Sequence, residues 1–327
     1  MNILVTGGAG YIGSVTVEAL ATRGDSVVVV DNLALGHRGA VDPEIPFHDV
    51  NLQDSAAVAK ILWEHKIDAV VHFAAFSLVG ESVTDPAKYM RNNVGGMMAL
   101  LDAMKDTGVK QLVFSSTAAT YGEPESIPLR EDHPTKPANP YGLTKRIMEQ
   151  ITETYAAAYG FRFVALRYFN ACGATVARGE DHDPETHLIP LILQVAAGKR
   201  EFISIFGTDY ETPDGTCIRD YIHVSDLADA HLRALDYLAK GGAPLICNLG
   251  NGSGFSVREV IEACRTITGY AIPAKEVPRR AGDPSRLIAD ASLAREKLGW
   301  KPIRSGLREI ILDAWTWHQR NPRGYGG

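Results

Sequence analysis

Residues 3–13 read Ile3-Leu4-Val5-Thr6-Gly7-Gly8-Ala9-Gly10-Tyr11-Ile12-Gly13 and join an apolar run to a glycine-rich turn. Within this turn, Gly7, Gly10 and Gly13 follow the G-x-x-G-x-x-G spacing, which permits a tight turn and a close approach of the backbone to a pyrophosphate. A helical pattern begins at about Tyr11, so the positive end of a helix would face that pyrophosphate. The stretch predicts the start of a dinucleotide-binding unit, with ordinary turn chemistry as the alternative.

An acidic residue stands where this fingerprint requires one. Asp31 follows the apolar run Val27–Val30, about 20 residues past the last glycine, where a carboxylate would accept hydrogen bonds from ribose hydroxyls. A carboxylate there repels a 2′-phosphate, so the sequence favours NAD over NADP. The alternative is a strand-end residue that begins an Asx turn with Asn32.

Short apolar runs alternate with amphipathic stretches through the first half of the chain. Strands are expected near residues 3–5, 27–30, 69–73, 111–116 and 163–166, and helices near 11–23, 55–65, 86–107 and 141–159. The strands are nearly continuous apolar runs, as in a sheet that helices cover on both faces. We therefore predict an α/β fold with a Rossmann-type doubly wound parallel sheet.

The pattern changes after about Phe169, where glycine, proline and charged residues become more frequent. Helices are expected near residues 187–197, 225–238, 256–268 and 305–318, and serines at 225, 256 and 305 are candidate N-caps for three of them. The predicted domains are 1–169, an NAD-binding Rossmann domain with a returning segment near 219–240, and 170–327. The second is expected to be a smaller, interrupted α/β lobe that binds the substrate.

Tyr141 and Lys145 are four residues apart on a predicted helix and therefore share one face. A free phenol has a pKa of about 10 and is a poor base at neutral pH. A neighbouring ammonium group and a positive nicotinamide ring would lower that pKa, so the pair is a candidate proton-transfer site. The alternative is an ordinary Tyr/Lys pair on the surface of an amphipathic helix.

Thr117 follows the predicted strand 111–116, at the edge where doubly wound sheets bind their ligands. Its hydroxyl is a candidate relay for a proton between substrate and Tyr141. The alternative is a β-branched residue that merely ends a strand.

Composition restricts the class of partner. The chain has 327 residues with a net charge of −6, and its basic residues form no long run, so we expect no nucleic-acid or membrane partner. None of its apolar runs approaches the roughly 20 residues that span a bilayer. The four cysteines form no C-x-x-C pair and are expected to be free thiols of a cytoplasmic protein. The glycine-rich tail 324–327 is expected to fray.

Motifs along almost the whole chain resemble the extended short-chain dehydrogenase/reductase superfamily and, within it, the UDP-glucose 4-epimerase family. The motifs that carry the resemblance are TGGAGYIG from Thr6, DNL from Asp31, HFAA from His72, VGES from Val79, NNV from Asn92, YG at Tyr121, PYGLTK from Pro140, LRYFN from Leu166, HLIP from His187, IFGTDY from Ile205, DGTCIRDYIHVSDLA from Asp214 and RRAGD from Arg279. The later motifs separate this family from its relatives.

The resemblance implies NAD as the cofactor, a UDP-hexose as the substrate and Tyr141, Lys145 and Thr117 as the catalytic residues. The residues that it implies for NAD are Gly7, Gly10, Tyr11, Ile12, Gly13, Asp31, Asn32, Asp49, Val50, Phe73, Ala74, Ala75, Asn92, Ser115, Tyr141, Lys145 and Tyr168. Those implied for the UDP-sugar are Thr117, Tyr141, Asn170, His187, Leu188, Phe206, Arg219, Arg280 and Asp283, with Phe206 near the uracil. Arginine suits a diphosphate because its planar fork donates two aligned hydrogen bonds.

The sequence departs from the family pattern at three positions. Ser77 replaces a lysine that contacts the cofactor in some members, and His187 replaces an asparagine. Leu287 occupies the position of a gating side chain whose bulk affects whether N-acetylated sugars fit. The range of accepted sugars, including UDP-pentoses, therefore stays open.

The implied activity is the interconversion of UDP-galactose and UDP-glucose in galactose metabolism, through oxidation at C4 to a 4-keto sugar, rotation and re-reduction. Alternatives are an epimerase for UDP-pentoses or UDP-N-acetylhexosamines, a sugar-nucleotide dehydratase, and an inactive NAD-binding regulator. A dehydratase usually carries an acidic residue just after the Thr117 position, where this chain has Ala118 and Ala119. An inactive regulator would be expected to lose Tyr141 or Lys145.

Two further features complete the expectations. Residues 181–187, Asp-His-Asp-Pro-Glu-Thr-His, contain many potential metal ligands, but the mixed spacing and Pro184 favour a solvated acidic loop without a metal. The helices near 86–107 and 141–159 carry apolar residues such as Met97, Met98 and Ile151. Because family members typically pair these two helices with a symmetry mate, we expect a C2 homodimer.

Overall fold

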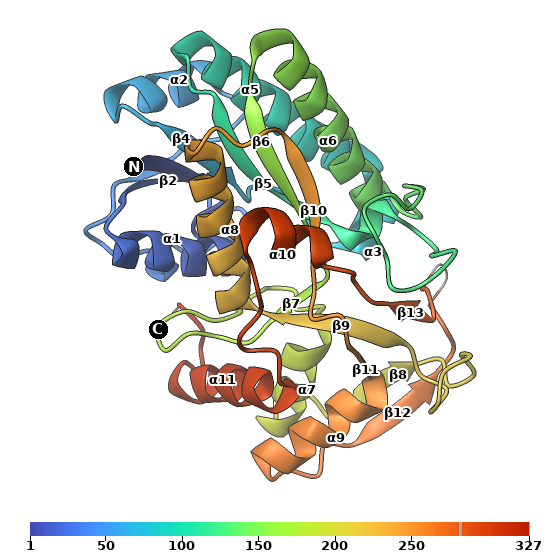
Figure 1. The fold of residues 1–327 in the computed structure, drawn as a ribbon. Helices are drawn as coiled ribbons and strands as arrows, with labels where there is room; N and C mark the ends of the chain where they lie inside the picture. The colour runs from blue at the N-terminus through green and yellow to red at the C-terminus, as the bar shows by residue number, and fades with distance from the viewer. Residues whose placement is uncertain (281–282, 327) are drawn as a thin grey trace.

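A computed structural model describes residues 1–280 and 283–326, and a seven-stranded sheet forms its centre (Figure 1). The strand order is β10-β6-β5-β4-β1-β2-β3, and neighbouring strands run parallel. The strands are β1 (Asn2–Thr6), β2 (Ser26–Asp31), β3 (Phe47–Asp49), β4 (Ala69–His72), β5 (Gln111–Thr117), β6 (Arg162–Tyr168) and β10 (Leu245–Leu249). The predicted doubly wound parallel sheet is confirmed.

Helices cover both faces of this sheet because alternate side chains of each strand point to opposite sides. Ile3 and Val5 of β1 join one buried apolar cluster, which includes residues of α1 (Tyr11–Arg23), α8 (Val224–Ala239) and α10 (Ser292–Leu298). Leu4, between them, joins a second cluster with α2 (Ser55–Glu64), α5 (Gly95–Thr107) and α6 (Pro140–Tyr159). Figure 1 shows these two helical layers with the sheet between them.

The helix expected over 86–107 is interrupted. It consists of α4 (Pro86–Tyr89), a π-helical turn at Met90–Val94 and then α5. Buried Asn93 in this turn accepts a hydrogen bond from Phe76 N and donates to Phe76 O and to Thr144 Oγ1. A π turn inserts one residue into the helical repeat and is frequent near functional sites. Here it ties α6 to the segment that precedes α3 (Val79–Thr84), a short helix that the sequence did not predict.

A second lobe lies against the carboxyl edge of the sheet, at the bottom of Figure 1. It contains a four-stranded sheet of β7 (Asn170–Cys172), β9 (Ile218–His223), β11 (Gly254–Ser256) and β13 (Arg286–Leu287), and a two-stranded sheet of β8 (Ile203–Phe206) and β12 (Ala274–Val277). Helices α7 (Leu188–Ala196), α9 (Val257–Thr268) and α11 (Leu307–Arg320) enclose a third apolar cluster with them. These strands are short and carry many polar residues, so the apolar pattern does not reveal most of them.

The chain returns to the central sheet twice in its second half. Helix α8 occupies the predicted returning segment 219–240 and packs beside α1. Strand β10 pairs with β6 and lies beyond that segment, among residues assigned to the second lobe. The central sheet therefore includes residues 245–249, which the predicted domain division placed in the second lobe. The boundary at residue 169 remains a prediction.

Two of the three expected serine caps are wrong. Ser256 caps α9 and forms a reciprocal capping box with Glu259. At α8 the cap is instead His223, whose Nδ1 accepts a hydrogen bond from Ser225 N, and α11 begins after Gly306. The C-terminal tail does not fray at residue 325, because Tyr325 N donates to Asp181 Oδ2 and its hydroxyl bonds to Gly179.

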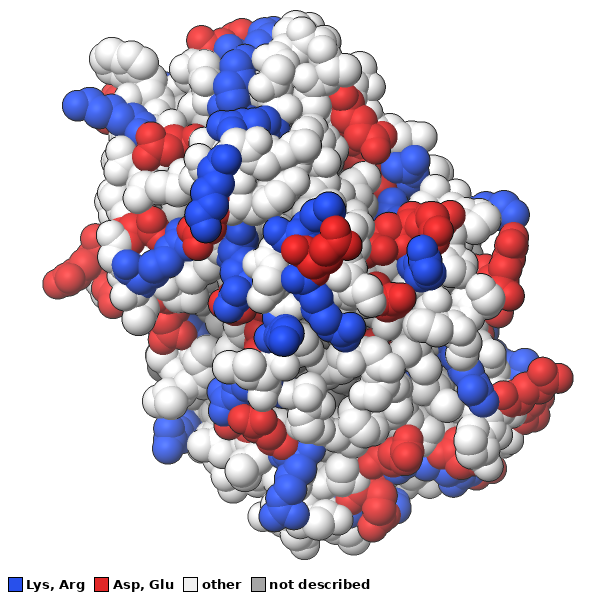
Figure 2. All heavy atoms as spheres, viewed as in Figure 1, with Lys and Arg blue, Asp and Glu red and all other residues white. Residues whose placement is uncertain are grey.

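Charged side chains of both signs are intermingled over the face of the molecule seen in Figure 2. No continuous basic stripe is visible on this face. Among the described residues, none of the helices is both long enough and apolar enough to cross a membrane.

A buried ion pair joins α6 to the sheet. Arg167 of β6 donates from Nε and Nη2 to the two carboxylate oxygens of Glu149, at 2.8 and 2.7 Å. The two side chains are 4% and 0% exposed, and Arg146 reaches the same carboxylate at 3.0 Å. Such a bidentate pair is strong in a dry interior, and removal of one partner leaves the other charge unpaired.

The variant Arg167→Ala is expected to lower the free energy of unfolding by about 3 kcal/mol, because Glu149 stays buried and loses its bidentate partner, with Arg146 and the Ser116 hydroxyl left beside it. The matched control Arg233→Ala removes an exposed pair with Asp229 and is expected to cost less than about 1 kcal/mol. Urea titrations followed by fluorescence measure both values. Equal losses for the two variants would contradict this account.

Candidate active site

A cavity of about 1090 Å³ runs along the carboxyl ends of the central strands and continues between them and the second lobe. Doubly wound sheets bind ligands at this edge, where the strand order changes direction beside β1 and β4. Its volume is at the upper end of the roughly 300–1,000 Å³ typical of ligand pockets. The site therefore has room for a large ligand or for two ligands side by side.

The glycine turn forms one end of this cavity. Gly7 adopts a left-handed conformation with φ 73°, and a Cβ on it would lie 2.5 Å from Ala74 N. A Cβ on Gly13 would lie 2.1 Å from Gly7 O. Helix α1 begins after Gly10, which has no side chain to cap the free backbone N–H groups of the first turn. Gly10, Tyr11 and Gly13 line the cavity, so these N–H groups are available to a ligand there. These features fit a pyrophosphate close to the backbone.

Asp31 connects the glycine turn to the end of β2. Its carboxylate accepts hydrogen bonds from Ala9 N at 3.0 Å and from Leu33 N at 2.9 Å. The bond to Leu33 is the Asx-type turn considered as the alternative, so the structure contains both that turn and a link to the glycine fingerprint. Burial raises the pKa of Asp31, and Asp49 adds to this effect, while the backbone bonds oppose it. The carboxyl group lines the cavity, as ribose recognition requires.

The proton-transfer residues come from three elements. Helix α6 begins at Pro140 because Asn139 caps it, with Oδ1 accepting from Gly142 N at 2.9 Å. Its first turns bring Tyr141 and Lys145 to the cavity beside Thr117, which ends β5. Lys145 is buried and donates from Nζ to Ser115 O at 2.8 Å and to Ser115 Oγ at 3.2 Å.

The pKa shifts at this group differ from the sequence expectation. Burial raises the pKa of Tyr141, and a hydrogen bond from Thr117 partly offsets the rise. Burial lowers the pKa of Lys145 to about 7, with Glu149 opposing the shift. In the protein alone, the Tyr141 pKa is therefore raised and Lys145 bonds to Ser115; the expected lowering, which also involves a bound nicotinamide, stays a prediction.

A buried histidine to which the sequence gave no role, His231, contacts Tyr168 on the cavity wall. His231 bonds from Nδ1 to Leu227 O, which leaves Nε2 to accept a 2.6 Å hydrogen bond from the Tyr168 hydroxyl. Burial lowers the pKa of His231 to about 4, so this histidine is neutral at physiological pH. Tyr168 lines the cavity, and its orientation depends on a residue 63 positions away that no local pattern connects to it.

Most of the predicted site residues lie together on the cavity wall. They are Gly7, Gly10, Tyr11, Ile12, Gly13, Asp31, Asn32, Val50, Phe73, Ala74, Ala75, Asn92, Ser115, Thr117, Tyr141, Lys145, Tyr168, Asn170, His187, Arg219, Arg280 and Asp283. Ser77 and Leu287 also line it. The Ala281-Gly282 part of the RRAGD motif lies outside the described residues.

Three predicted residues do not line this cavity. Asp49 ends β3 beside Asp31, Leu188 begins α7 and packs on the third apolar cluster, and Phe206 ends β8. The Phe206 ring is covered by the Arg280 guanidinium, 3.8 Å from the ring centroid, and so reaches the cavity only through Arg280. Arg280 and Arg219, the latter ion-paired with Asp283, bring cationic groups of the second lobe to the cavity wall.

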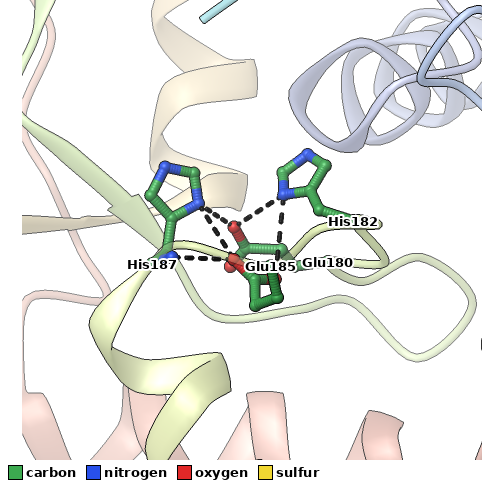
Figure 3. Close-up of side chains that lie close together, drawn as sticks. All are labelled: Glu180, His182, Glu185 and His187. Carbon is green, nitrogen blue, oxygen red and sulfur yellow. Dashed lines mark hydrogen bonds and ion pairs between the residues drawn. The ribbon is translucent and has the colours of Figure 1, made fainter. Parts of the chain in front are cut away.

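The acidic loop is solvated in part: Asp183, Pro184 and Thr186 are exposed, whereas two glutamate side chains are buried. The side chains of Glu180 and Glu185 are both 4% exposed, and they contact His182 and His187 (Figure 3). Burial opposes protonation of His187, but Glu180 raises its pKa to about 9. Burial is also overcome at Glu180, where the two histidines lower the carboxyl pKa to about 2. His182 and His187 face the cavity and make this loop part of its wall.

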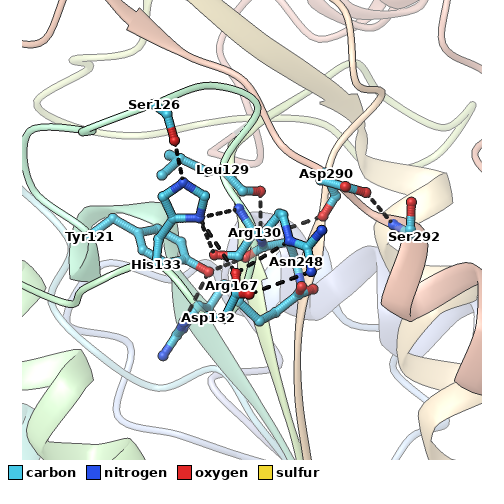
Figure 4. Close-up of polar contacts among 11 residues, drawn as sticks. Tyr121, Ser126, Leu129, Arg130, Asp132, His133, Arg167, Asn248, Asp290 and Ser292 are labelled. Carbon is cyan, nitrogen blue, oxygen red and sulfur yellow. Dashed lines mark hydrogen bonds and ion pairs between the residues drawn. The ribbon is translucent and has the colours of Figure 1, made fainter.

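A polar network supports the cavity from behind (Figure 4). Asn248 of β10 accepts from the Tyr121 hydroxyl at 2.7 Å and donates to Leu129 O at 3.0 Å. Arg167 donates to the same hydroxyl at 2.9 Å, and Leu129 O also accepts from Asp290 N at 2.7 Å. The network joins the sheet to the segment that leads from β13 to α10.

Comparisons with known proteins agree with this geometry. A family model described as "NAD dependent epimerase/dehydratase family" matches residues 3–250. The chain is 54% identical to the UDP-glucose 4-epimerase of Lacticaseibacillus casei, over 100% of this chain and 99% of the relative. It matches a crystal structure of a UDP-glucose 4-epimerase with a TM-score of 0.98 and 51% identity, over the whole of both chains. The UDP-glucose 4-epimerase of Bifidobacterium longum in complex with NAD+ and UDP matches with a TM-score of 0.94 and 38% identity, over 99% of this chain and 100% of that one.

The variant Gly13→Ala is expected to lower NAD affinity at least about tenfold, because the added methyl group would push Gly7 O and open the turn at the pyrophosphate. The control Gly306→Ala adds a methyl group where no atom lies within 4 Å and should leave affinity unchanged. Calorimetric titration of the nucleotide-free proteins with NAD measures both. Unchanged affinity in Gly13→Ala would show that the turn does not carry the pyrophosphate.

Proposed function

The chain belongs to the NAD dependent epimerase/dehydratase family, and we propose that it interconverts UDP-galactose and UDP-glucose by inverting the hexose at C4. One observation carries the proposal: Tyr141 and Thr117 share a single cavity with the glycine turn of the first lobe and with Arg219 and Arg280 of the second. This arrangement supports a reactive carbon held between a dinucleotide and a proton-transfer group, with a diphosphate gripped at a distance.

Tyr141 acts first as the base. As a phenolate it accepts the O4 proton of the hexose, directly or through the Thr117 hydroxyl, while a hydride leaves C4 and a 4-keto sugar forms. NAD, when bound, supplies the hydride acceptor and the source of the returned hydride. The keto sugar turns about its link to the diphosphate, so the hydride returns to the other face, and Tyr141 gives the proton back to O4. Oxidation and reduction cancel within one cycle.

The remaining groups position the reactants. Arg219 and Arg280 suit the diphosphate because each guanidinium donates paired hydrogen bonds. Asn170, His187 and Asp283 are the other residues proposed to contact the UDP-sugar. Lys145, held by Ser115, is placed to bind the nicotinamide ribose and to set the charge near Tyr141. Burial keeps this region dry, which strengthens every electrostatic interaction inside it.

The other enzyme classes remain alternatives with distinguishable products. Ala118 and Ala119 follow Thr117 in a short 3₁₀ turn, so these positions offer no carboxylate for the additional proton transfer of a dehydratase. Leu287 lines the cavity and is proposed to limit the size of the accepted sugar. Incubation with UDP-galactose, UDP-N-acetylglucosamine and UDP-xylose in parallel separates these activities. Failure to convert UDP-galactose, with NAD bound, would overturn the proposal and favour an inactive regulator.

The variant Tyr141→Phe is expected to reduce kcat by about 10²–10⁴-fold, because the proton acceptor is removed while the ring and its packing remain. The control Tyr159→Phe changes a half-exposed tyrosine at the far end of the same helix and should leave kcat unchanged. A coupled assay for UDP-glucose measures the rates, and bound NAD is measured in parallel. Full activity in Tyr141→Phe would assign the proton transfer to another group.

We also propose that the protein acts in galactose metabolism in the cytoplasm. Cys172, Cys217, Cys247 and Cys264 are all free and buried, which supports a reducing compartment.

A C2 homodimer through α5 and α6 is proposed as the working assembly. Met98 on α5 and Leu143 on α6 are 45% and 41% exposed and support an apolar contact between copies. Met97 and Ile151 contribute less than the sequence suggested, since Met97 lies in the core and Ile151 is partly buried.

The dimer predicts a mass of twice 35.4 kDa in light scattering. The variant Met98→Glu is expected to shift the protein towards monomer, because it places one charge from each copy in the proposed apolar contact. The control Ile303→Glu alters an exposed side chain on a loop of the second lobe and should leave the mass unchanged. A wild-type mass of a single chain would reject the dimer.

A further inference from the structure

We propose that Glu180, His182, Glu185 and His187 form a structural binding site for one zinc ion in the wall of the active-site cavity. These four residues, named here the 180–187 cluster, lie on one loop between β7 and α7 (Figure 3). The site shares His187 with the residues proposed to contact the UDP-sugar, but its geometry does not depend on which sugar the cavity accepts.

Most spacings among the ligand atoms are close to those around a tetrahedral zinc ion, but His187 Nδ1 and Glu180 Oε1 are in a direct hydrogen bond that the ion would have to replace. The four residues each offer one ligand atom, and these atoms all lie within 4.8 Å of one another. His182 Nδ1 is 3.3 Å from Glu180 Oε1 and 3.8 Å from Glu185 Oε2, and His187 Nδ1 is 3.6 Å from Glu185 Oε1. With ligand bonds of about 2.0–2.2 Å, the edges of a zinc tetrahedron measure roughly 3.3–3.6 Å.

The two buried carboxylates of the cluster need positive charge beside them; the ion pairs with His182 and His187 supply it in the protein alone, and a divalent ion would replace them. The Glu180 and Glu185 side chains are almost fully buried, and two carboxylates at this depth are costly unless positive charge is placed beside them. One divalent ion neutralises both and also uses the imidazole nitrogens that face them. Two imidazole and two carboxylate ligands suit zinc, whereas calcium and magnesium prefer oxygen ligands alone.

The ligands are held in place by neighbouring groups. Glu185 Oε1 accepts hydrogen bonds from Thr186 N and His187 N, each at 2.7 Å. The start of the loop is fixed by the C-terminal tail, where Tyr325 bonds to Gly179 and to Asp181. Metal ligands in proteins are commonly oriented by such outer contacts, which raise affinity because less order is lost on binding.

The sequence argument against a metal considered residues 181–187 and so left out Glu180, which supplies one of the four ligands. The ligands stand at positions 180, 182, 185 and 187, while the intervening Asp181 and Asp183 take no part. Pro184 lies between His182 and Glu185 and does not prevent their side chains from converging. The convergence of these four side chains depends on the fold of the loop, which the spacing of the residues in the sequence does not reveal.

Four protein ligands leave no open position on a tetrahedral ion, so the role is structural. His182 packs edge-to-face on Tyr11, with ring centroids 6.2 Å apart, and Tyr11 begins the helix that follows the glycine turn. His182 and His187 line the cavity. The ion would therefore fix the loop that joins the dinucleotide end of the cavity to the first helix of the second lobe.

The test uses the full-length protein, stripped with a chelator and then titrated with Zn²⁺ alone, with metal content read by mass spectrometry after gel filtration. About one zinc ion per chain is expected. The variants Glu180→Gln and His182→Gln should lower zinc affinity at least about tenfold. The control His65→Gln removes one ring of the partly exposed His48–His65 pair, where zinc could bind adventitiously. This variant should leave the zinc affinity of the 180–187 cluster unchanged. Substitution with Co²⁺ should give the strong visible bands of a tetrahedral site in the wild type and in His65→Gln, but not in Glu180→Gln or His182→Gln.

Negligible zinc uptake by the wild type would overturn the proposal without any variant. Uptake that survives Glu180→Gln and His182→Gln but is lost in His65→Gln would overturn it as well, by assigning the metal to the surface pair. Circular dichroism and bound NAD confirm that each variant is folded. Because the readout is metal content, it stays separate from the epimerase assay, and either conclusion can fail alone.

Discussion

The close approach of two backbone segments at the switch point of the sheet is the constraint on which the site depends. Gly7 leaves β1 in a left-handed conformation so near to Ala74, just beyond β4, that a methyl group would lie 2.5 Å from the Ala74 nitrogen. Gly13 is packed as tightly against Gly7. Only glycine permits both contacts. They bring the N-terminal end of α1, the Asp31 carboxylate and the carboxyl edge of the sheet together. This arrangement fixes the orientation in which a dinucleotide can bind.

The exclusion of water from the site is the second requirement, and it shifts the pKa values of the buried groups near Tyr141. Burial lowers the pKa of Lys145 to about 7 and that of His72 to about 3, and it raises that of Tyr141. In each case the charged form is penalised because water is excluded. Charges that enter with the ligands therefore act on Tyr141 with little screening, which suits a residue that must both accept and return a proton.

Polar contacts between residues far apart in the chain hold the central sheet to the segments packed around it. Arg167 joins β6 to Glu149 of α6, and Asn248 of β10 joins Tyr121 to Leu129. The 180–187 cluster plays the same part at the other wall of the cavity. A site built between lobes needs such fixed contacts because a displacement of about 1 Å at the reacting groups can cost 10²-fold in rate.

The sequence by itself determined the central sheet, the glycine turn, Asp31 and the Tyr141–Lys145 pair. These features depend on apolar periodicity, glycine spacing and the helical repeat, which act between residues close in the chain. Only the tertiary structure decided that β10 completes the sheet, that Lys145 bonds to Ser115 and that the Glu180 and Glu185 side chains are buried beside two histidines. Each of these outcomes depends on which distant segments exclude water from a polar group, and no local pattern carries that information.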